Sequence, residues 1–200
     1  MTKLQESLYN KAIIDIQKFC KKNRIKMPKV CIADVTSKRH KRWCGYYAWG
    51  EDTITVIPKA CIPPAKTPGW TWHYPRYFND LSVYGVICHE FGHYLHFKRL
   101  HKYDKVDQPD FDSEKPLSNC EYNYIEAIAE MIKLFIVNPD LLRRANPERY
   151  RFMTEICKLK PITTQNWKNR LGKNIHPRYV AQCKKRIEAT ERKLAKSKYV

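Results

Sequence analysis

The chain has 200 residues, 43% of them hydrophobic, and a formal net charge of +18 at pH 7. This length suits one domain with an extension, and no apolar run approaches the about 20 residues that a membrane-spanning helix needs. Eight cysteines without a C-x-x-C pair, and a start too polar for a signal peptide, predict reduced thiols instead of a disulfide framework. We therefore expect a cytoplasmic protein that does not enter a membrane.

The first part of the chain predicts one helix followed by a small sheet. An amphipathic pattern predicts a helix over about residues 4–22, and residues 29–35 are typical of a strand. Residues 43–49 and 53–57 predict a hairpin that turns at residues 50–52. Residues 58–78, rich in proline and aromatic side chains, predict a long loop that contains His73. This loop could wall a substrate cleft, stack on bases or pack over a sheet face, and His73 could assist catalysis.

The strongest chemical pattern is His89-Glu90-x-x-His93, within a helical pattern over residues 86–96. On a helix these two histidines lie on one face, about 6 Å apart along the axis, which suits two imidazole ligands of one zinc ion. Glu90 is then placed to take a proton from a water that the metal activates. The alternative is a pair of structural histidines on an apolar helix. The helix is expected to start at Asn79 or Asp80 and to bury a stripe of Leu81, Tyr84, Cys88, Phe91 and Leu95.

A catalytic zinc site usually has three protein ligands, and a second predicted helix offers the third. This helix follows a capping box at residues 118–121, covers about residues 122–135 and ends before Pro139. It carries Glu126 and Glu130 on one face, where two like charges repel and need a cation or a hydrogen-bond partner. We assign Glu126 as the third ligand and Glu130 as the acceptor of a hydrogen bond from a ligand histidine. The small alanines between them would allow close helix packing, and two solvated glutamates are the alternative.

The pattern His89-Glu90-x-x-His93 followed by Glu126-Ala127-x-Ala129-Glu130 resembles the gluzincins, in a compact form similar to ImmA/IrrE-like, minigluzincin and phage-encoded metallopeptidases. The resemblance covers roughly residues 43–139. It implies an α+β, zincin-like domain with a small mixed sheet, one zinc ion per chain and hydrolysis of a protein or peptide substrate. It also implies that residues 53–57 form the sheet edge that receives substrate as an added strand, although an interior strand is the alternative. If the chain is phage-encoded, its location is the host cytoplasm.

The resemblance to gluzincins also implies a side chain outside the zinc motif that stabilises the oxyanion. Candidates are Tyr124, His176, Arg178 and Tyr179. Asn146 and Pro147 predict a helix that runs to about residue 159, and His176-Pro177 predicts the start of a last, basic helix. The acidic residues between 102 and 117 lack the spacing of a calcium loop and predict a solvated connection. We therefore divide the chain into a metallopeptidase domain over residues 1–157 and a basic, mainly helical extension over residues 158–200.

Positive charge is concentrated at the two ends of the chain. The net charge is +9 over residues 1–42, −2 over residues 43–157 and +11 over residues 158–200. Such flanks could bind DNA or RNA by releasing counterions from phosphates, or an acidic protein, or serve only as a solubilising surface. The alternative function is therefore a nucleic-acid-binding protein with a structural or vestigial zinc site. The candidate contacts are Lys38, Arg39, Lys41, Arg42, Lys184, Lys185 and Arg186.

Overall fold

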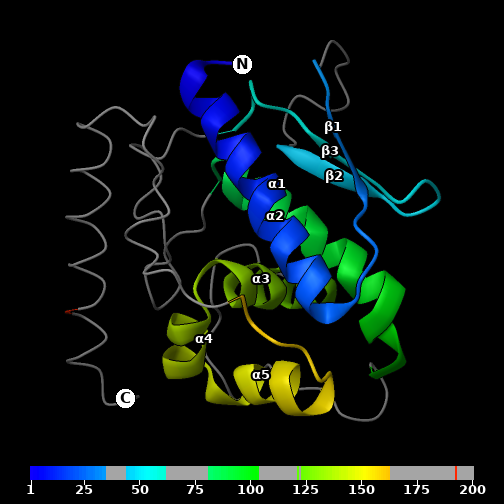
Figure 1. Cartoon of the computed structure of the whole chain (residues 1–200), viewed down its shortest axis with the longest axis vertical. Coiled ribbons are helices and arrows are strands. Elements are labelled where there is room, and N and C mark those ends of the chain that lie inside the picture. Colours follow the sequence, from blue (N-terminus) through cyan, green and yellow to red (C-terminus); the bar gives the residue numbers. More distant parts are fainter. Residues whose placement is uncertain (35–43, 62–80, 104–120, 122, 163–191, 193–200) are drawn as a thin grey trace.

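The structure is a computed structural model that describes residues 1–34, 44–61, 81–103, 121, 123–162 and 192. The structure combines helices with a small mixed three-stranded sheet, which confirms the expected α+β class (Figure 1). In the described part of the chain, no helix is both long and apolar enough to cross a bilayer, and the six described cysteines form no disulfide. The elements are α1 (Lys3–Asn23), β1 (Lys29–Ile32), β2 (Gly45–Ala48), β3 (Thr53–Val56), α2 (Val83–Leu95), α3 (Tyr124–Val137), α4 (Pro139–Ala145) and α5 (Pro147–Arg151).

Helix α1 matches the helix predicted over residues 4–22. Its first turn is fixed by a capping box, in which the Thr2 hydroxyl accepts from the Gln5 amide and the Gln5 side chain accepts from the Thr2 amide. It ends at Arg24, whose left-handed φ of 53° lets its N–H reach the last carbonyls. The apolar face buries residues at helical spacing, including Ile16 and Phe19.

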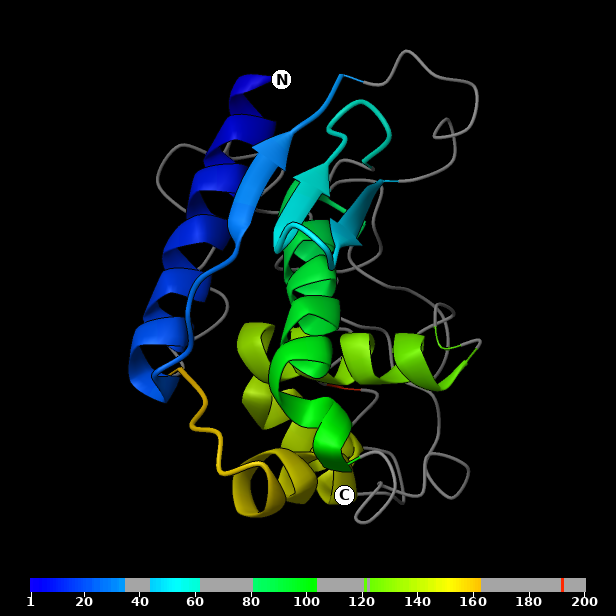
Figure 2. The ribbon, with the colours of Figure 1, turned by 90° about the vertical axis from the view of Figure 1, so that its right-hand side faces the viewer.

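The sheet has the strand order β1-β3-β2, with β1 parallel and β2 antiparallel to β3. The β2–β3 hairpin occurs as predicted, with Tyr47 opposite Ile54. The implied edge position of residues 53–57 is wrong, because β1 pairs with one side of β3 and β2 with the other (Figure 2). All four β3 residues are buried, and within the described part of the chain β1 and β2 are the outer strands of the sheet.

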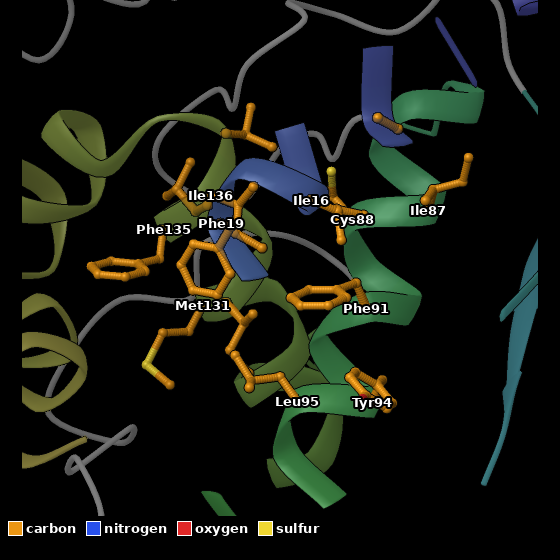
Figure 3. Packing of buried hydrophobic residues seen from close by; sticks show 14 of the residues in the cluster. Ile16, Phe19, Ile87, Cys88, Phe91, Tyr94, Leu95, Met131, Phe135 and Ile136 are labelled. Carbon is orange, nitrogen blue, oxygen red and sulfur yellow. The ribbon is translucent and has the colours of Figure 1, made fainter. Parts of the chain in front are cut away.

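Helix α2 packs against the sheet, α1 and α3. Its N-cap is Ser82, whose hydroxyl accepts from the Gly85 amide; Asn79 and Asp80, the expected caps, lie outside the described residues. Of the predicted stripe, Leu81 is half-buried and the other four side chains are buried. The core centres on Phe19 of α1, whose ring meets Phe91 of α2 and Phe135 of α3 edge-on, with centroids 5.9 and 6.2 Å apart (Figure 3).

Helices α2 and α3 approach closely at Gly92. A Cβ atom on Gly92 would lie 2.7 Å from the carbonyl oxygen and 2.8 Å from the Cα atom of Ala129, so no larger residue fits without separating the helices. Ala129, one of the two alanines expected to permit close packing, lies at this contact, whereas the role of Gly92 was not predicted. This contact brings the histidine-bearing face of α2 against the first half of α3.

The start of α3 differs from the prediction. Its N-cap is Asn123, whose side chain accepts from the Glu126 amide at 3.0 Å, and not the capping box at residues 118–121. Glu121, which the capping box was expected to employ, forms a buried ion pair with Arg149 at 2.9 Å. The pairing partner lies 28 residues away in the chain, so local spacing could not reveal it.

The end of α3 follows the prediction, with Asn138 as C-cap before Pro139. Pro139 also begins α4, a helix that the sequence analysis missed although proline suits a first helical position. Asn146 and Pro147 start α5 as predicted, and the helix continues as a π-helical turn over Phe152–Ile156. It therefore ends slightly before the predicted residue 159.

Candidate metal centre

Three side chains from α2 and α3 converge on one point. Nε2 of His89 lies 3.1 Å from Nε2 of His93 and 3.1 Å from Oε2 of Glu126, and Nε2 of His93 lies 3.5 Å from Oε1 of Glu126. Ligands at 2.0–2.1 Å from a tetrahedral zinc ion are separated from one another by about 3.3 Å. All three separations are close to this value. Among the described residues, His89, His93 and Glu126 thus form a group that could hold a metal ion.

The carboxylate of Glu126 enters the site from the first turn of α3. This position, three residues after the Asn123 cap, places the negative charge at the positive end of the helix dipole. Burial alone would raise the pKa of Glu126, but hydrogen bonds with His89 and His93 hold it well below its usual range. The carboxylate is therefore ionised at neutral pH, as a metal ligand must be.

Glu130 lies one helical turn beyond Glu126 and contacts His89 at Nδ1, the ring nitrogen that does not face the candidate metal position. Its Oε1 atom is 2.6 Å from Nδ1 of His89 and 3.0 Å from Nζ of Lys133. Burial raises the pKa of Glu130, but the charges and hydrogen bonds of Lys133 and His89 outweigh it and lower the pKa to about 2. An ionised Glu130 accepts a hydrogen bond from the N–H at Nδ1 of His89, which leaves Nε2 directed at the metal position.

Lys133 is the residue of this cluster that the sequence analysis missed. Its side chain is 1% exposed and pairs with Glu130, whose side chain is 0% exposed. The available signal was a lysine three residues after Glu130 within an apolar run, Met131-Ile132-Lys133-Leu134-Phe135. The expectation that the two glutamates need a compensating cation was general, and Lys133 is that cation for Glu130.

Without a metal ion, the imidazole of His89 is charged and carries a proton on both ring nitrogens. Burial lowers the pKa of His89, but the hydrogen bonds that it donates to Glu126 and Glu130 and the charges of Glu130 and Glu90 outweigh it and raise the pKa to about 9. At neutral pH, the proton therefore occupies the position that a cation would take between the imidazoles and Glu126. Binding of a divalent metal must displace this proton.

Glu90 lies beside the ligand histidines and faces strand β2. A Cβ atom on Gly45 would lie 3.3 Å from Cγ of Glu90 and 2.7 Å from Cγ1 of Val86, so only glycine lets β2 approach α2 here. Burial raises the pKa of Glu90, although the charges of His89 and His93 act against it. A carboxylate with a raised pKa next to a metal position is suited to accept and return a proton.

Of the proposed oxyanion stabilisers, the structure describes Tyr124. It is the first residue of α3, and its ring meets the buried His96 edge-on at a centroid distance of 6.0 Å. His73 and the remaining candidates lie outside the described residues. These candidates are His176, Arg178 and Tyr179, together with Lys38, Arg39, Lys41, Arg42, Lys184, Lys185 and Arg186 of the basic flanks.

Comparison of the chain with models of known families, with curated proteins and with solved structures finds no match. The α+β fold and the His89, His93 and Glu126 group therefore rest on the sequence and the structure themselves.

Proposed function

We propose that this chain is a zinc-dependent metallopeptidase of the gluzincin type, with a zincin-like fold. The observation that carries the proposal is the spacing of His89, His93 and Glu126, which matches three ligands of a tetrahedral zinc ion. Two imidazoles and one carboxylate leave a fourth position open, as in catalytic zinc sites. A site with only a structural role would not need Glu90 beside it.

The chemistry divides between the metal and Glu90. A bound zinc ion supplies Lewis acidity, which polarises the scissile carbonyl and lowers the pKa of a water molecule. Glu90 takes a proton from the attacking water and returns it to the leaving amine, a role that fits its raised pKa. Glu130 holds His89 in the tautomer that presents Nε2 to the metal, through the 2.6 Å contact with Nδ1.

The outer edge of β2, which pairs with no other strand of the described residues, is the place we assign to an extended substrate. Ile57 donates its N–H to the Cys44 carbonyl, so the alternation of an antiparallel ladder leaves the backbone groups of Gly45 and Tyr47 pointing away from β3. Gly45 lies against Glu90. A polypeptide that pairs with this edge as an added strand would therefore pass the metal centre.

The basic flanks support a second candidate function, binding of DNA or RNA. Residues 1–42 and 158–200 carry net charges of +9 and +11, against −2 for the segment that contains the metal centre. The two functions are compatible, because basic flanks could bring a peptidase to proteins that are bound to nucleic acid. A DNA affinity that falls steeply with salt, without any zinc-dependent proteolysis, would favour the alternative of a binding protein with a structural zinc site.

The direct test of the peptidase proposal is Glu90→Gln. We expect this variant to retain zinc, because Glu90 is not a ligand, and to lose at least 100-fold in the rate at which it cleaves a mixture of unfolded proteins. Glu148→Gln, at an exposed ion pair with Arg151, is the matched control and should cleave like the wild type. Full cleavage by Glu90→Gln would overturn the assigned mechanism.

A further inference from the structure

Three aromatic rings form a shelf at the hairpin end of β2. Trp49, directly after β2, stacks on Phe97 with ring centroids 5.5 Å apart and planes 23° apart, and Tyr47 stacks on Phe97 at 6.2 Å. We call Tyr47, Phe97 and Trp49 the aromatic shelf. Trp49 is 71% exposed, more than any other large hydrophobic residue of the described chain. The shelf therefore presents a large indole face to solvent.

Polar contacts hold the Tyr47 ring of the aromatic shelf in place. The Tyr47 hydroxyl donates to Oδ1 of Asp52 at 3.1 Å, and the same oxygen lies 2.8 Å from Nζ of Lys98. The Tyr47 ring also meets Tyr94 edge-on at 5.7 Å. Because these contacts order the rings in the free protein, the binding of a ligand to them costs the protein little side-chain conformational entropy.

The aromatic shelf and the metal centre lie along the same helix and strand. Phe97 follows His93 by four residues, about one helical turn, in the π-helical segment His96–Leu100 that extends α2. Strand β2 runs beside α2 in the same direction, with Gly45 against Glu90, Tyr47 against Tyr94 and Trp49 against Phe97 (Figure 2). The outer edge of β2 therefore connects Glu90 at one end to the aromatic shelf at the other.

We infer that the aromatic shelf binds a large apolar or aromatic side chain of the peptide substrate, on the N-terminal side of the cleaved bond. The inference rests on the proposed function and deepens it. A strand added antiparallel to β2, the commoner pairing, runs from Trp49 toward Gly45, so residues at the shelf precede those at Glu90. Four residues of strand span about 13 Å, which places the selected side chain about two to four residues before the cleaved bond.

The sheet edge beside the shelf favours a polypeptide over a nucleic acid. The backbone groups of Gly45 and Tyr47 point away from β3, and a polypeptide can pair with them as an added strand while one of its side chains lies on the rings. A phosphate backbone cannot extend a sheet in this way. Lys98, a cation beside the shelf, is already paired with Asp52.

The test is a cleavage profile on a mixed-sequence peptide library, with cut sites mapped by mass spectrometry. For the zinc-loaded wild type, we expect enrichment of Phe, Tyr, Trp, Leu or Met two to four residues before the cut. Trp49→Ala should lower the ratio of aromatic to alanine at that position about tenfold, and Trp49→Phe should retain most of it. Ile32→Ala, an exposed apolar residue on the opposite edge strand β1, is the control and should keep the wild-type profile. A flat profile, or an unchanged profile in Trp49→Ala, would overturn the inference.

A binding measurement separates failure of the shelf from failure of the peptidase. Zinc-loaded Glu90→Gln protein is titrated into labelled extended peptides that differ only by an aromatic residue or alanine, and fluorescence anisotropy gives the two affinities. Trp49-dependent preference for the aromatic peptide, without cleavage by the wild type, would support the shelf and reject the peptidase. No preference in binding would overturn the shelf. Binding of a single-stranded oligonucleotide that is lost in Trp49→Ala would reassign the shelf to nucleic acid and overturn the peptide assignment.

Discussion

Nζ of Lys133 lies 3.0 Å from Oε1 of Glu130, and both side chains are shielded from solvent. The same oxygen lies 2.6 Å from Nδ1 of His89. A buried carboxylate is costly unless it is paired, and this pair lies directly behind a candidate metal ligand. The cation thus keeps Glu130 ionised in the core, and the ionised Glu130 orients His89.

Removal of the buried cation should destabilise the fold. We expect Lys133→Met to lower the free energy of unfolding by about 3–5 kcal/mol, because Glu130 then remains as an unpaired buried charge. The double variant Glu130→Gln/Lys133→Met should recover part of this loss, since it leaves no unpaired ion. Urea denaturation of the metal-free proteins measures both changes.

The matched control for this prediction is an exposed pair at the same spacing. Glu148 and Arg151 are three residues apart, and their side chains are 54% and 62% exposed. Arg151→Met should change the free energy of unfolding by less than about 1 kcal/mol. Equal effects of Lys133→Met and Arg151→Met would show that the buried pair does not have the proposed role.

The stability of the metal-free protein should fall as the pH rises from 6.5 to 9. The pKa of His89 is about 9 in the folded protein, above its ordinary value of 6.5. A raised pKa means that the stabilisation is complete below pH 6.5 and is lost as the pH rises through the folded value, by at most about 3 kcal/mol. Unfolding of wild type and His89→Gln across this range measures the effect. A wild-type decline no steeper than that of His89→Gln would contradict the prediction.

At acid pH, the stability of the metal-free protein should change with pH in the opposite direction. Glu126 and Glu130 both have lowered pKa values, so their stabilisation is present above an ordinary pKa of 4.5 and is lost as the pH falls toward 2. In metal-free Glu130→Gln protein, we expect a smaller loss of stability between pH 4.5 and pH 2 than in the wild type. Thermal unfolding over this range gives the comparison, and identical acid profiles would refute the assigned ionisation of Glu130.

The close approach of α2 and α3 should be essential for the metal centre. A methyl group at Gly92 would lie 2.7 Å from the Ala129 carbonyl oxygen, so Gly92→Ala must move the helix of Glu126 away from that of His89 and His93. We expect a loss of about 1–3 kcal/mol of stability and at least a tenfold loss of zinc affinity. Gly50→Ala is the control, because an added Cβ there meets nothing within 4 Å. Unchanged zinc affinity in Gly92→Ala would contradict this account of the helix contact.

Local spacing predicted which site residues share a helix face, whereas the α+β class came from the resemblance to gluzincins and Glu126 was assigned because a third ligand was needed from another helix. Two histidines four residues apart on a helix must share a face, and Glu126 and Glu130 do so for the same reason. The central position of β3 could not be decided from the sequence, because the parallel pairing of Lys29 with Thr53 joins β1 to β3 past β2, which lies between them in the chain. The pairing of Glu121 with Arg149 was missed for a similar reason, since tertiary packing brings these residues together.

Helix starts were predicted less well than helix positions. Ser82 and Asn123 are good capping residues, but other cap-forming residues nearby in the sequence compete with them. The burial of Lys133 depends on how α3 packs against α2, and the sequence of α3 alone does not determine this packing. The sequence pattern thus predicted the metal-binding face, whereas the cation behind it and the strand beside it came from the tertiary structure.

The measurement that tests the central claim most directly is the zinc content of purified wild-type and Glu126→Ala protein, by elemental analysis under metal-replete conditions. Glu148→Ala, at an exposed ion pair, serves as the matched control. We expect about one zinc ion per chain in the wild type and in the control, and a large loss in Glu126→Ala, because only two protein ligands remain. Absence of zinc from the wild type would contradict the metallopeptidase account. Full retention of zinc by Glu126→Ala would contradict the assignment of Glu126 as the third ligand.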